Sequence, residues 1–369
     1  MKVLMIGHYK EFGGWGKACR DYILAMDSVG IDVVPRAFKL NDSKPKIPAR
    51  ILELEEKSIE GCTHCIQHLL PHHLDFNGRF KKNIALCVYE SFSDKLSGWS
   101  SKINTMDELW TSSRHSESAF LSNDVNIPIK RVPHTFDTSI YSQQYEKMSN
   151  PELDGNFIFY TIADLNKRKD LFSLIQAFHL AFSPNEPVRL LIKTSKHGMS
   201  PEETANIVMD ECSKIKQSMK LYRRIEDYSS EIIVTHELSE EDIMKIHATC
   251  DCFVTTSHGE AWCIPLFDAM SMGKMAIYPE GMFEFTHAKT GALKFEIPTS
   301  PIPVFGLNDS FFELGSSREV WEQSDVLDLV KFMREAYEGR DIKCNAASNI
   351  QKLYSYKTIG NKIKGLLNE

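Results

Sequence analysis

Apolar runs alternate with segments of helical periodicity along the chain, and this alternation occurs twice. In the first half, the apolar runs predict strands over residues 3–6, 31–34, 84–89, 108–111 and 129–132. Between the first two runs, residues at helical spacing predict a helix with one apolar face: Cys19, Tyr22, Ile23 and Met26. The first half is therefore predicted to consist of strands joined by helices.

The second half begins after the polar segment MSNPELDG (residues 148–155), which is typical of a linker. Its apolar runs predict strands over residues 157–162, 188–193, 232–234, 252–255 and 275–278. A helical stripe follows the first of these strands, made of Leu171, Leu174, Ile175, Phe178 and Phe182. Ser239 followed by Asp242 predicts a capping box, and residues 325–367 are predicted to be mostly helical.

Strands that alternate with helices form parallel sheets with helices on both faces. The chain is therefore predicted to be an α/β protein with two Rossmann-like, doubly wound domains that face a cleft. We expect the domains over residues 1–150 and 151–345, and we expect the helices of residues 346–369 to pack back on the first domain. Ligands of such sheets bind at the carboxyl ends of the strands, so the residues that follow the strands carry the candidate chemistry.

Composition narrows the class of protein. The chain has 369 residues, 42% hydrophobic and 25% charged, which excludes disordered and collagen-like classes. The net charge of −7 shows no basic excess for nucleic acid or anionic membranes. Nine scattered cysteines indicate a reducing compartment. We find neither a signal peptide nor an apolar run long enough to span a membrane, so we expect a cytoplasmic protein.

A glycine-rich segment, GHYKEFGGWGKACRDY (residues 7–22), follows the first predicted strand. Gly13, Gly14 and Gly16 lie in the predicted loop before the first helix, where backbone amides can approach a ligand. The segment matches neither the nicotinamide fingerprint nor the phosphate-binding loop that ends in Lys-Ser or Lys-Thr. The alternative is a tight turn without a ligand.

The strongest signal is TTSHGEAWCIPLFDAMSMGKMAIYP (residues 255–279). A strand ends near Thr255, a short loop carries Glu260, and Pro265 suits the first turn of a helix that carries Asp268. A helix N-terminus after a strand offers free N–H groups to an anion such as a diphosphate, and carboxylates beside it can hold sugar hydroxyls. The alternative is that both acids are solvated surface charges.

The spacing Glu260-x7-Asp268 resembles the E-x7-E motif of the retaining GT-B glycosyltransferases, especially glycosyltransferase family 4 (glycosyl transferases group 1). FIFYTIADLNKRKDLFSLIQAF (residues 157–178) resembles the family's donor domain. Two further segments resemble the family's acceptor domain: YESFSDKLSGWSSKINTMDELWTSSRHSESAF and VPHTFD. The resemblance implies the GT-B fold and a retaining, metal-independent transfer of a hexosyl group from a nucleotide-diphosphate sugar, a co-substrate, with no cofactor. Polysaccharide, lipid-linked glycan, protein, small-molecule and nucleic-acid acceptors all stay open.

The resemblance also implies roles for single residues. Glu260 corresponds to the acid that contacts the donor sugar, Asp268 to the acid that holds the ribose, and Lys169 to the lysine on the diphosphate. Further expected donor contacts are Gly13, Gly14, Ala261, Trp262, Cys263, Ile264 and Lys193. For Lys193 a plain surface position is an equal alternative.

The sequence departs from the family pattern at several positions. Asp268 replaces Glu, and Ala261 and Cys263 stand where the family has glycines. Asp164 replaces the family's arginine, and we expect Lys167 and Arg168 to supply that charge. Candidate acceptor or cleft residues are Glu90, which stands near the place of the family's histidine, and His134; a structural role is the alternative for both.

Three further alternatives remain. Cys62 and Cys65, with His64, His68, His72 and His73 nearby, could hold a metal, but the second ligand pair of a zinc site is missing, and we expect none. A nucleotide-sugar epimerase of the same fold is a second enzyme class. A nucleotide-sugar-binding protein that has lost turnover is the third alternative.

Overall fold

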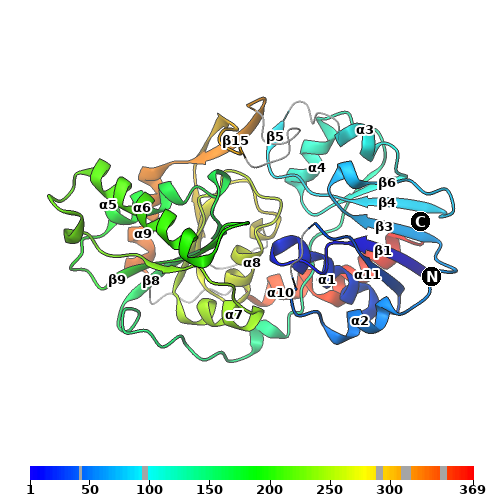
Figure 1. The fold of residues 1–369 in the computed structure, drawn as a ribbon, viewed down its shortest axis with the longest axis horizontal. Helices are drawn as coiled ribbons and strands as arrows, with labels where there is room; N and C mark the ends of the chain where they lie inside the picture. The colour runs from blue at the N-terminus through cyan, green and yellow to red at the C-terminus, as the bar shows by residue number, and fades with distance from the viewer. Residues whose placement is uncertain (41–43, 94–98, 288–293, 309–316, 341–346) are drawn as a thin grey trace. The chain divides into compact units, whose positions relative to one another are not determined.

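The computed structural model describes residues 1–40, 44–93, 99–287, 294–308, 317–340 and 347–369. It divides into two units, the first made of Met1–Ile140 with Asn349–Glu369 and the second of Tyr141–Ser348. Each unit is built on a parallel sheet (Figure 1). No helix within the described ranges is long and apolar enough to cross a membrane.

The described residues of the first unit form a six-stranded parallel sheet in the order β2-β1-β3-β4-β6-β7. Its strands are β1 (Lys2–Gly7), β2 (Asp32–Ala37), β3 (His64–His68), β4 (Lys82–Leu86), β6 (Glu108–Thr111) and β7 (Ile129–Arg131). A short strand, β5 (Phe92–Ser93), lies outside this sheet. The sheet is buried, because apolar side chains on its central strands, such as Val3 and Ile84, are fully inaccessible.

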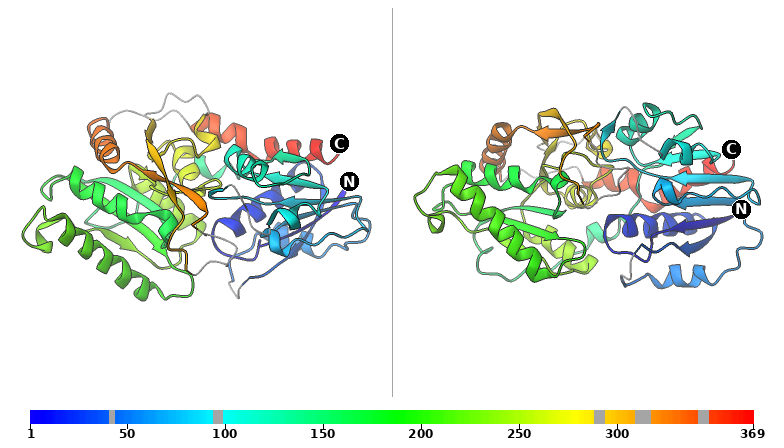
Figure 2. Two further views of the ribbon diagram at one scale, coloured as in Figure 1. Left: turned by 90° about the horizontal axis from the view of Figure 1, so that it is seen from above. Right: turned by 45° about the horizontal axis from the view of Figure 1, so that its top comes forward.

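Helices of the first unit come from both ends of the chain. They are α1 (Gly13–Ser28), α2 (Ala49–Glu55), α3 (Trp99–Ile103), α4 (Arg114–Leu121), α10 (Ala347–Tyr354) and α11 (Tyr356–Leu366), with the 3₁₀ turn η1 (Pro71–His73). The turn η2 (Ile140–Ser142) and the first residues of α10 lie at the boundary with the second unit. Helix α11 packs on α1, and the Tyr356 hydroxyl donates to Asp21 Oδ1 at 2.5 Å. The two termini consequently lie close together in every view (Figure 2).

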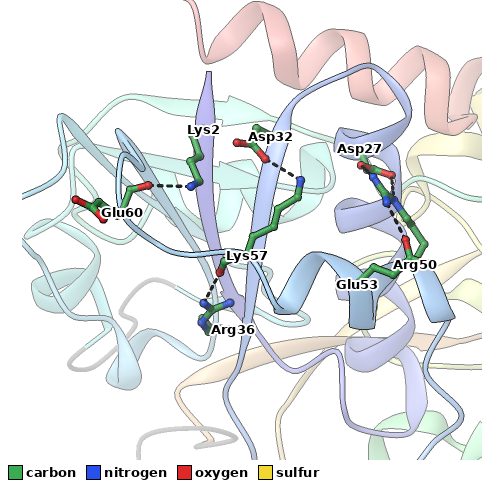
Figure 3. A network of polar contacts seen from close by, with 8 residues as sticks. All are labelled: Lys2, Asp27, Asp32, Arg36, Arg50, Glu53, Lys57 and Glu60. Carbon is green, nitrogen blue, oxygen red and sulfur yellow. Dashed lines mark hydrogen bonds and ion pairs between the residues drawn. The ribbon is translucent and has the colours of Figure 1, made fainter.

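A network of polar contacts surrounds α2 (Figure 3). Lys57 Nζ lies 2.7 Å from Asp32 Oδ1, and Arg36 donates to the Lys57 carbonyl at 2.8 Å. Arg50 of α2 contacts Asp27 of α1 at 2.8 Å. Exposed ion pairs contribute only about 0–1 kcal/mol each, so these contacts orient α2 more than they stabilise the unit.

In the second unit, the described strands form a parallel sheet in the order β10-β9-β8-β11-β12-β13. They are β8 (Phe157–Asp164), β9 (Val188–Ser195), β10 (Ile232–Val234), β11 (Cys252–Val254), β12 (Met275–Pro279) and β13 (Lys294–Ile297). Strands β14 (Thr299–Pro303) and β15 (Glu319–Ser324) pair antiparallel apart from this sheet.

The helices of the second unit cover both faces of its sheet. They are α5 (Leu171–Ala181), α6 (Pro201–Met219), α7 (Glu240–Thr249), α8 (Ile264–Ser271) and α9 (Val326–Glu338), with turns η3 (Lys167–Lys169), η4 (Ile225–Asp227) and η5 (Glu284–His287). Phe157 and Phe159 of β8 belong to one core cluster with α5, α6 and α9. Tyr160, which points to the opposite face, contacts His247 of α7.

Most predicted strands occur within a few residues of their predicted bounds, and those over residues 108–111 and 232–234 have the same bounds. The strand predicted over residues 84–89 is wrong at its end, because β4 stops at Leu86. Beyond it, the Ser116 hydroxyl accepts from the Tyr89 amide at 3.0 Å and donates to the Tyr89 carbonyl at 2.9 Å, and so takes the place of a strand partner.

Other local predictions differ in detail. Ser239 caps α7, but the Asp242 carboxylate contacts the Ser239 hydroxyl at 2.7 Å rather than completing a capping box with the backbone. The predicted linker, residues 148–155, contains no helix or strand. Of the predicted helical stretch 325–367, residues 341–346 lie outside the described residues.

Candidate active site in the second unit

Two loops leave the same edge of the second sheet, because β8 and β11 are parallel neighbours. After β8 comes η3, and we call residues 167–170 the basic turn. After β11 comes the segment that leads into α8, and we call residues 255–263 the Glu260 loop. As predicted, Pro265 lies in the first turn of α8. The carboxyl edge of this sheet thus brings the basic turn to the Glu260 loop.

Glu260 is the centre of this arrangement. Its carboxylate is 4% exposed and forms an ion pair with Lys169 Nζ through Oε1. Arg168 Nη1 lies 3.3 Å from the other oxygen, Oε2. Burial alone raises the pKa of Glu260, but Lys169 and Arg168 outweigh burial and hold that pKa below its ordinary value. Glu260 is therefore an ionised, buried acid and not the solvated surface charge of the alternative interpretation.

Hydrogen bonds from the Glu260 loop hold the backbone of the basic turn. The Thr256 hydroxyl donates to the Asp170 carbonyl at 2.7 Å, and the Ser257 hydroxyl and the His258 amide donate to the Arg168 carbonyl at 3.2 and 2.7 Å. In return, Arg168 Nη1 donates to the Gly259 carbonyl at 2.6 Å. These hydrogen bonds therefore hold the basic turn and the Glu260 loop against each other.

Four residues expected to contact the donor lead from the Glu260 loop into α8: Ala261, Trp262, Cys263 and Ile264. Cys263 caps α8 in the left-handed conformation, with φ of 62°, which glycine adopts most easily. Its thiol is buried, and burial raises its pKa to about 12, so it is not a nucleophile at neutral pH. Ala261 and Trp262 are buried, with Trp262 packed against Phe285, whereas Ile264 is half-buried.

Asp268 lies two turns into α8 and is 3% exposed, again unlike a solvated surface charge. The Tyr141 hydroxyl donates to Asp268 Oδ1 at 2.5 Å. Tyr141 also packs against Phe267, with ring centroids 6.2 Å apart. Asp268 is therefore held within the unit by Tyr141, a partner that the sequence pattern does not predict.

Lys193 lies on the same sheet edge, near the end of β9. Its amine is buried, which lowers its pKa, although Asp164 and Glu237 oppose this shift. Lys193 Nζ donates to the Thr194 carbonyl at 3.2 Å. It is not the plain surface lysine of the alternative interpretation.

The remaining candidates belong to the first unit. Gly13 and Gly14 are exposed and form the first turn of α1, so the prediction that they precede the helix is wrong. Gly13 has a φ of +80°, which disfavours any other residue there. His134 is buried against the Tyr22 hydroxyl at 3.0 Å, and burial, with Lys17, lowers its pKa to about 3. Glu90 is half-buried in the segment after β4.

The cysteine–histidine segment of the first unit is largely a strand. Cys65 lies on β3, buried against Leu4 and Phe80. Across the part of the chain that the structure describes, no three His, Cys, Asp or Glu side chains are grouped to hold a metal ion.

Several site contacts were missed by sequence reasoning. Asn166 accepts from the Lys169 amide at 3.1 Å and so starts the basic turn, a role that its position before three basic residues could have suggested. Asp170 has a φ of 45°, and His258 lies 3.8 Å from it. Neither the left-handed conformation nor this pairing has a signal in the sequence pattern.

Comparisons with known proteins agree with this architecture. Residues 142–283 match the family described as glycosyl transferases group 1. No curated protein sequence matches the chain at a significant level.

Solved structures resemble the whole chain. The chain superposes on Anabaena HepE in complex with UDP-glucose with a TM-score of 0.63 at 15% identity, covering 100% of this chain and 99% of that one. For sucrose-phosphate synthase of Thermosynechococcus elongatus the TM-score is 0.65 at 13% identity, covering 100% and 98%. For an E. coli trehalose-6-phosphate protein bound with UDP-2-fluoro glucose, the TM-score is 0.65 at 10% sequence identity, and the match covers 100% of this chain and 99% of that one. The chain therefore has the GT-B fold of two Rossmann-like units, and its residues 142–283 carry the glycosyl transferases group 1 region.

Proposed function

We propose that the chain is a retaining glycosyltransferase that moves a hexosyl group from a nucleotide-diphosphate sugar to an acceptor hydroxyl. The observation that carries the proposal is the buried, ionised Glu260 beside Lys169 and Arg168, one short loop before the N-terminus of α8. The family match over residues 142–283 supports sugar transfer. Because HepE was solved with UDP-glucose and with UDP, a UDP-sugar is the first donor to test.

The basic turn suits a diphosphate leaving group. When the glycosidic bond to the diphosphate breaks, negative charge grows on the phosphate oxygens, and fixed cations stabilise that charge. A cation about 4 Å from it contributes roughly 4 kcal/mol at an effective dielectric near 20, before desolvation is subtracted. Lys169 and Arg168 are held in place for this role, because Arg168 donates to the Gly259 carbonyl and the Lys169 amide donates to Asn166.

The two acids of the motif suit hydroxyl groups of the donor. Glu260 is ionised and accepts hydrogen bonds only, so we assign it to the hydroxyls of the donor sugar. Asp268 is assigned to the ribose, beside the Tyr141 hydroxyl. Lys193 and the loop residues Ala261, Trp262, Cys263 and Ile264 complete the proposed donor site of the second unit. Gly13 and Gly14, on the first unit, stay proposed donor contacts from the sequence.

The proposed reaction needs no protein base and no metal. The acceptor oxygen attacks the anomeric carbon from the side of the leaving diphosphate, and a donor phosphate oxygen takes the acceptor proton. The new bond then forms on the face of the bond that breaks, which retains the anomeric configuration. Glu90 and His134 are proposed for the acceptor side, where a glycan, a lipid-linked glycan or another hydroxyl compound would bind.

We extend the proposal to the cytoplasm, because the eight cysteines within the described residues are free thiols. A binding protein without turnover is the second candidate, since Tyr141 already occupies Asp268 and Asp164 replaces an expected arginine. The epimerase alternative is not favoured by the comparisons.

A panel of UDP-, GDP- and ADP-sugars tests the proposal. Nucleotide release by the purified chain, unaffected by EDTA and lost in Glu260→Gln, supports a metal-independent transferase. Thermal stabilisation without release supports the binding protein, because saturating ligand at about 100 times its Kd adds about 2.7 kcal/mol. A chain stabilised by none of these compounds would contradict both, and the anomeric configuration of the product tests retention.

A further inference from the structure

Asp170 joins the basic turn to α5 under unusual conditions. Its backbone is left-handed, with φ of 45° and ψ of 51°, which costs a residue with a side chain of order 1 kcal/mol. Its Oδ1 atom accepts from the Ser173 amide at 3.3 Å and caps α5. The other oxygen, Oδ2, is buried and has no hydrogen-bond partner among the described residues. His258 Nε2 lies 3.8 Å from that oxygen.

The ring of His258 is fixed from two other directions. It stacks on Trp321 of β15, with centroids 5.4 Å apart and planes at 27°. Its Nδ1 atom lies 3.3 Å from the Glu322 carbonyl oxygen. A carbonyl oxygen only accepts hydrogen bonds, so this contact assigns the hydrogen of a neutral ring to Nδ1. A neutral His258 therefore turns the lone pair of Nε2 towards Asp170.

An ionised Asp170 and a neutral His258 would thus place two electron-rich atoms against each other in a buried site. One added proton removes this conflict, either on the ring or on the carboxyl group. We propose that Asp170 and His258 together carry one proton, either on the ring or on the carboxyl group, and that this proton holds the basic turn in the conformation that presents Lys169 and Arg168. The single proton of the pair is inferred from the geometry alone, whereas its effect on donor binding rests on the proposed function.

The backbone explains how the pair acts on the basic turn. The His258 amide donates to the Arg168 carbonyl at 2.7 Å, and the His258 carbonyl accepts from the Glu322 amide at 2.9 Å. Asp170 is the last residue of the basic turn, and Thr256 holds its carbonyl. Movement of either side chain therefore loosens the segment that carries both cations. Asp170 and His258 are positioning residues in this scheme, since they act through Lys169 and Arg168.

Among the described residues, charged and polar groups meet the pair from three elements. From the basic turn, Lys167 acts on Asp170, and Arg168 and Lys169 are engaged by Glu260. From α5 the pair meets the Ser173 amide, and from β15 it meets the Glu322 carbonyl. Burial raises the pKa of Asp170, and His258 and Ser173 oppose that shift, which agrees with a carboxyl group that competes for a proton.

The proton of the pair determines how order and donor affinity change with pH. If the ordered turn binds one proton more than the loosened turn, order and donor affinity are greatest at low pH and decline as the pair loses its proton. One linked proton changes a binding constant by at most about tenfold per pH unit.

The first test reads the proton without any ligand. Nitrogen shifts of the His258 ring and the carboxyl carbon shift of Asp170 are recorded by NMR at neutral pH, with His258→Phe and Asp170→Asn used for assignment. We expect either two protonated ring nitrogens or a protonated carboxyl group. A ring with an unprotonated Nε2 beside an ionised Asp170 would overturn the proposal.

The second test measures UDP affinity by calorimetry between pH 6 and 9. Asp170→Asn tolerates the left-handed backbone, still offers an oxygen that can cap α5, and can turn an uncharged amide N–H towards Nε2 at every pH. We expect it to bind UDP as tightly as the wild type does at low pH, and to lose the part of the pH dependence that belongs to the pair. Asp170→Ala and His258→Phe should bind UDP at least about tenfold more weakly, because neither can supply the hydrogen.

An exposed histidine of the same unit serves as the control. His197→Gln should keep the wild-type profile, since His197 is exposed on the segment between β9 and α6. Equal slopes for the wild type and Asp170→Asn would overturn the link between proton and donor. A wild-type protein that shows the shared proton but binds no UDP would instead refute the proposed UDP donor and leave the pair intact.

Discussion

Replacing Lys169 by alanine tests the proposed chemistry most directly. Its side chain is 14% exposed, and its amine is paired with Glu260, so the charge acts in a poorly solvated site. In the proposed reaction this amine meets a diphosphate whose negative charge grows as the bond breaks. Removing it should cost roughly 3 kcal/mol of transition-state stabilisation, most of the roughly 4 kcal/mol expected for such a pair at 4 Å. That loss slows turnover by about two orders of magnitude.

Saturating-donor kinetics separate this effect from simple binding. A cation that met the ground state and the transition state equally would change only the donor KM, whereas the growing charge predicts a fall in kcat as well. Lys167→Ala is the matched control, because Lys167 is exposed on the same turn. It should keep kcat within about threefold. Circular dichroism and thermal unfolding confirm that both variants remain folded.

The comparison with Arg168 decides the assignment. Arg168 also holds the Gly259 carbonyl, so Arg168→Ala should lower stability in addition to activity. If Lys169→Ala keeps the wild-type kcat while Arg168→Ala abolishes turnover, Lys169 is not the residue that faces the leaving group. If Lys167→Ala lowers kcat as much as Lys169→Ala does, the loss reflects the total positive charge of the turn and not the position of Lys169.

Three further changes have defined outcomes. Glu260→Gln should lose most transfer. Because Lys169 and Arg168 depress the pKa of Glu260, its ion pairs stabilise the fold above pH 4.5, and this stabilisation is lost as pH falls through the folded-state pKa. The free energies of unfolding of wild type and variant should therefore converge in acid, and a difference that stays constant with pH would contradict the ion pair. Gly360→Ala should lower the free energy of unfolding by about 1–3 kcal/mol, measured by urea unfolding, because its Cβ would lie 2.4 Å from the Ala25 carbonyl. Gly365→Ala has open space around its Cβ and should raise the free energy of unfolding by up to about 1 kcal/mol. Equal effects of the two variants would refute the packing of α11 on α1. Cys263, with a pKa of about 12, should resist iodoacetamide at pH 8 until urea unfolds the chain, and rapid native labelling detected by mass spectrometry would refute its burial.

The fold was largely predictable because its determinants are local and repetitive. Buried parallel strands leave uninterrupted apolar runs, and the helices between them leave stripes at helical spacing. Strand ends were less predictable, as at Tyr89, where a serine side chain from a distant helix takes over the backbone hydrogen bonds. Such a contact depends on tertiary structure and has no signature in the apolar pattern.

The candidate site was predictable in its residue types and less so in its partners. Glu260 and Asp268 were singled out by their spacing, and Lys169 by the family resemblance. The ion pair between Lys169 and Glu260 joins residues far apart in sequence, and it follows only once β8 and β11 are known to be neighbours. Tyr141, Asp170 and His258 were missed, because the sequence does not indicate the partners that they contact.

The ion pair also bears on how the donor site would work. A buried carboxylate without a partner is costly, so the pair with Lys169 and Arg168 keeps Glu260 ionised while no donor is bound. A diphosphate would compete for the same cations, and the sugar hydroxyls would then provide Glu260 with new hydrogen-bond donors. Binding therefore exchanges partners rather than adding them, so a nucleotide diphosphate without its sugar would leave Glu260 less well satisfied. It follows that the sugar should contribute to affinity through Glu260, and that this contribution should disappear in Glu260→Gln.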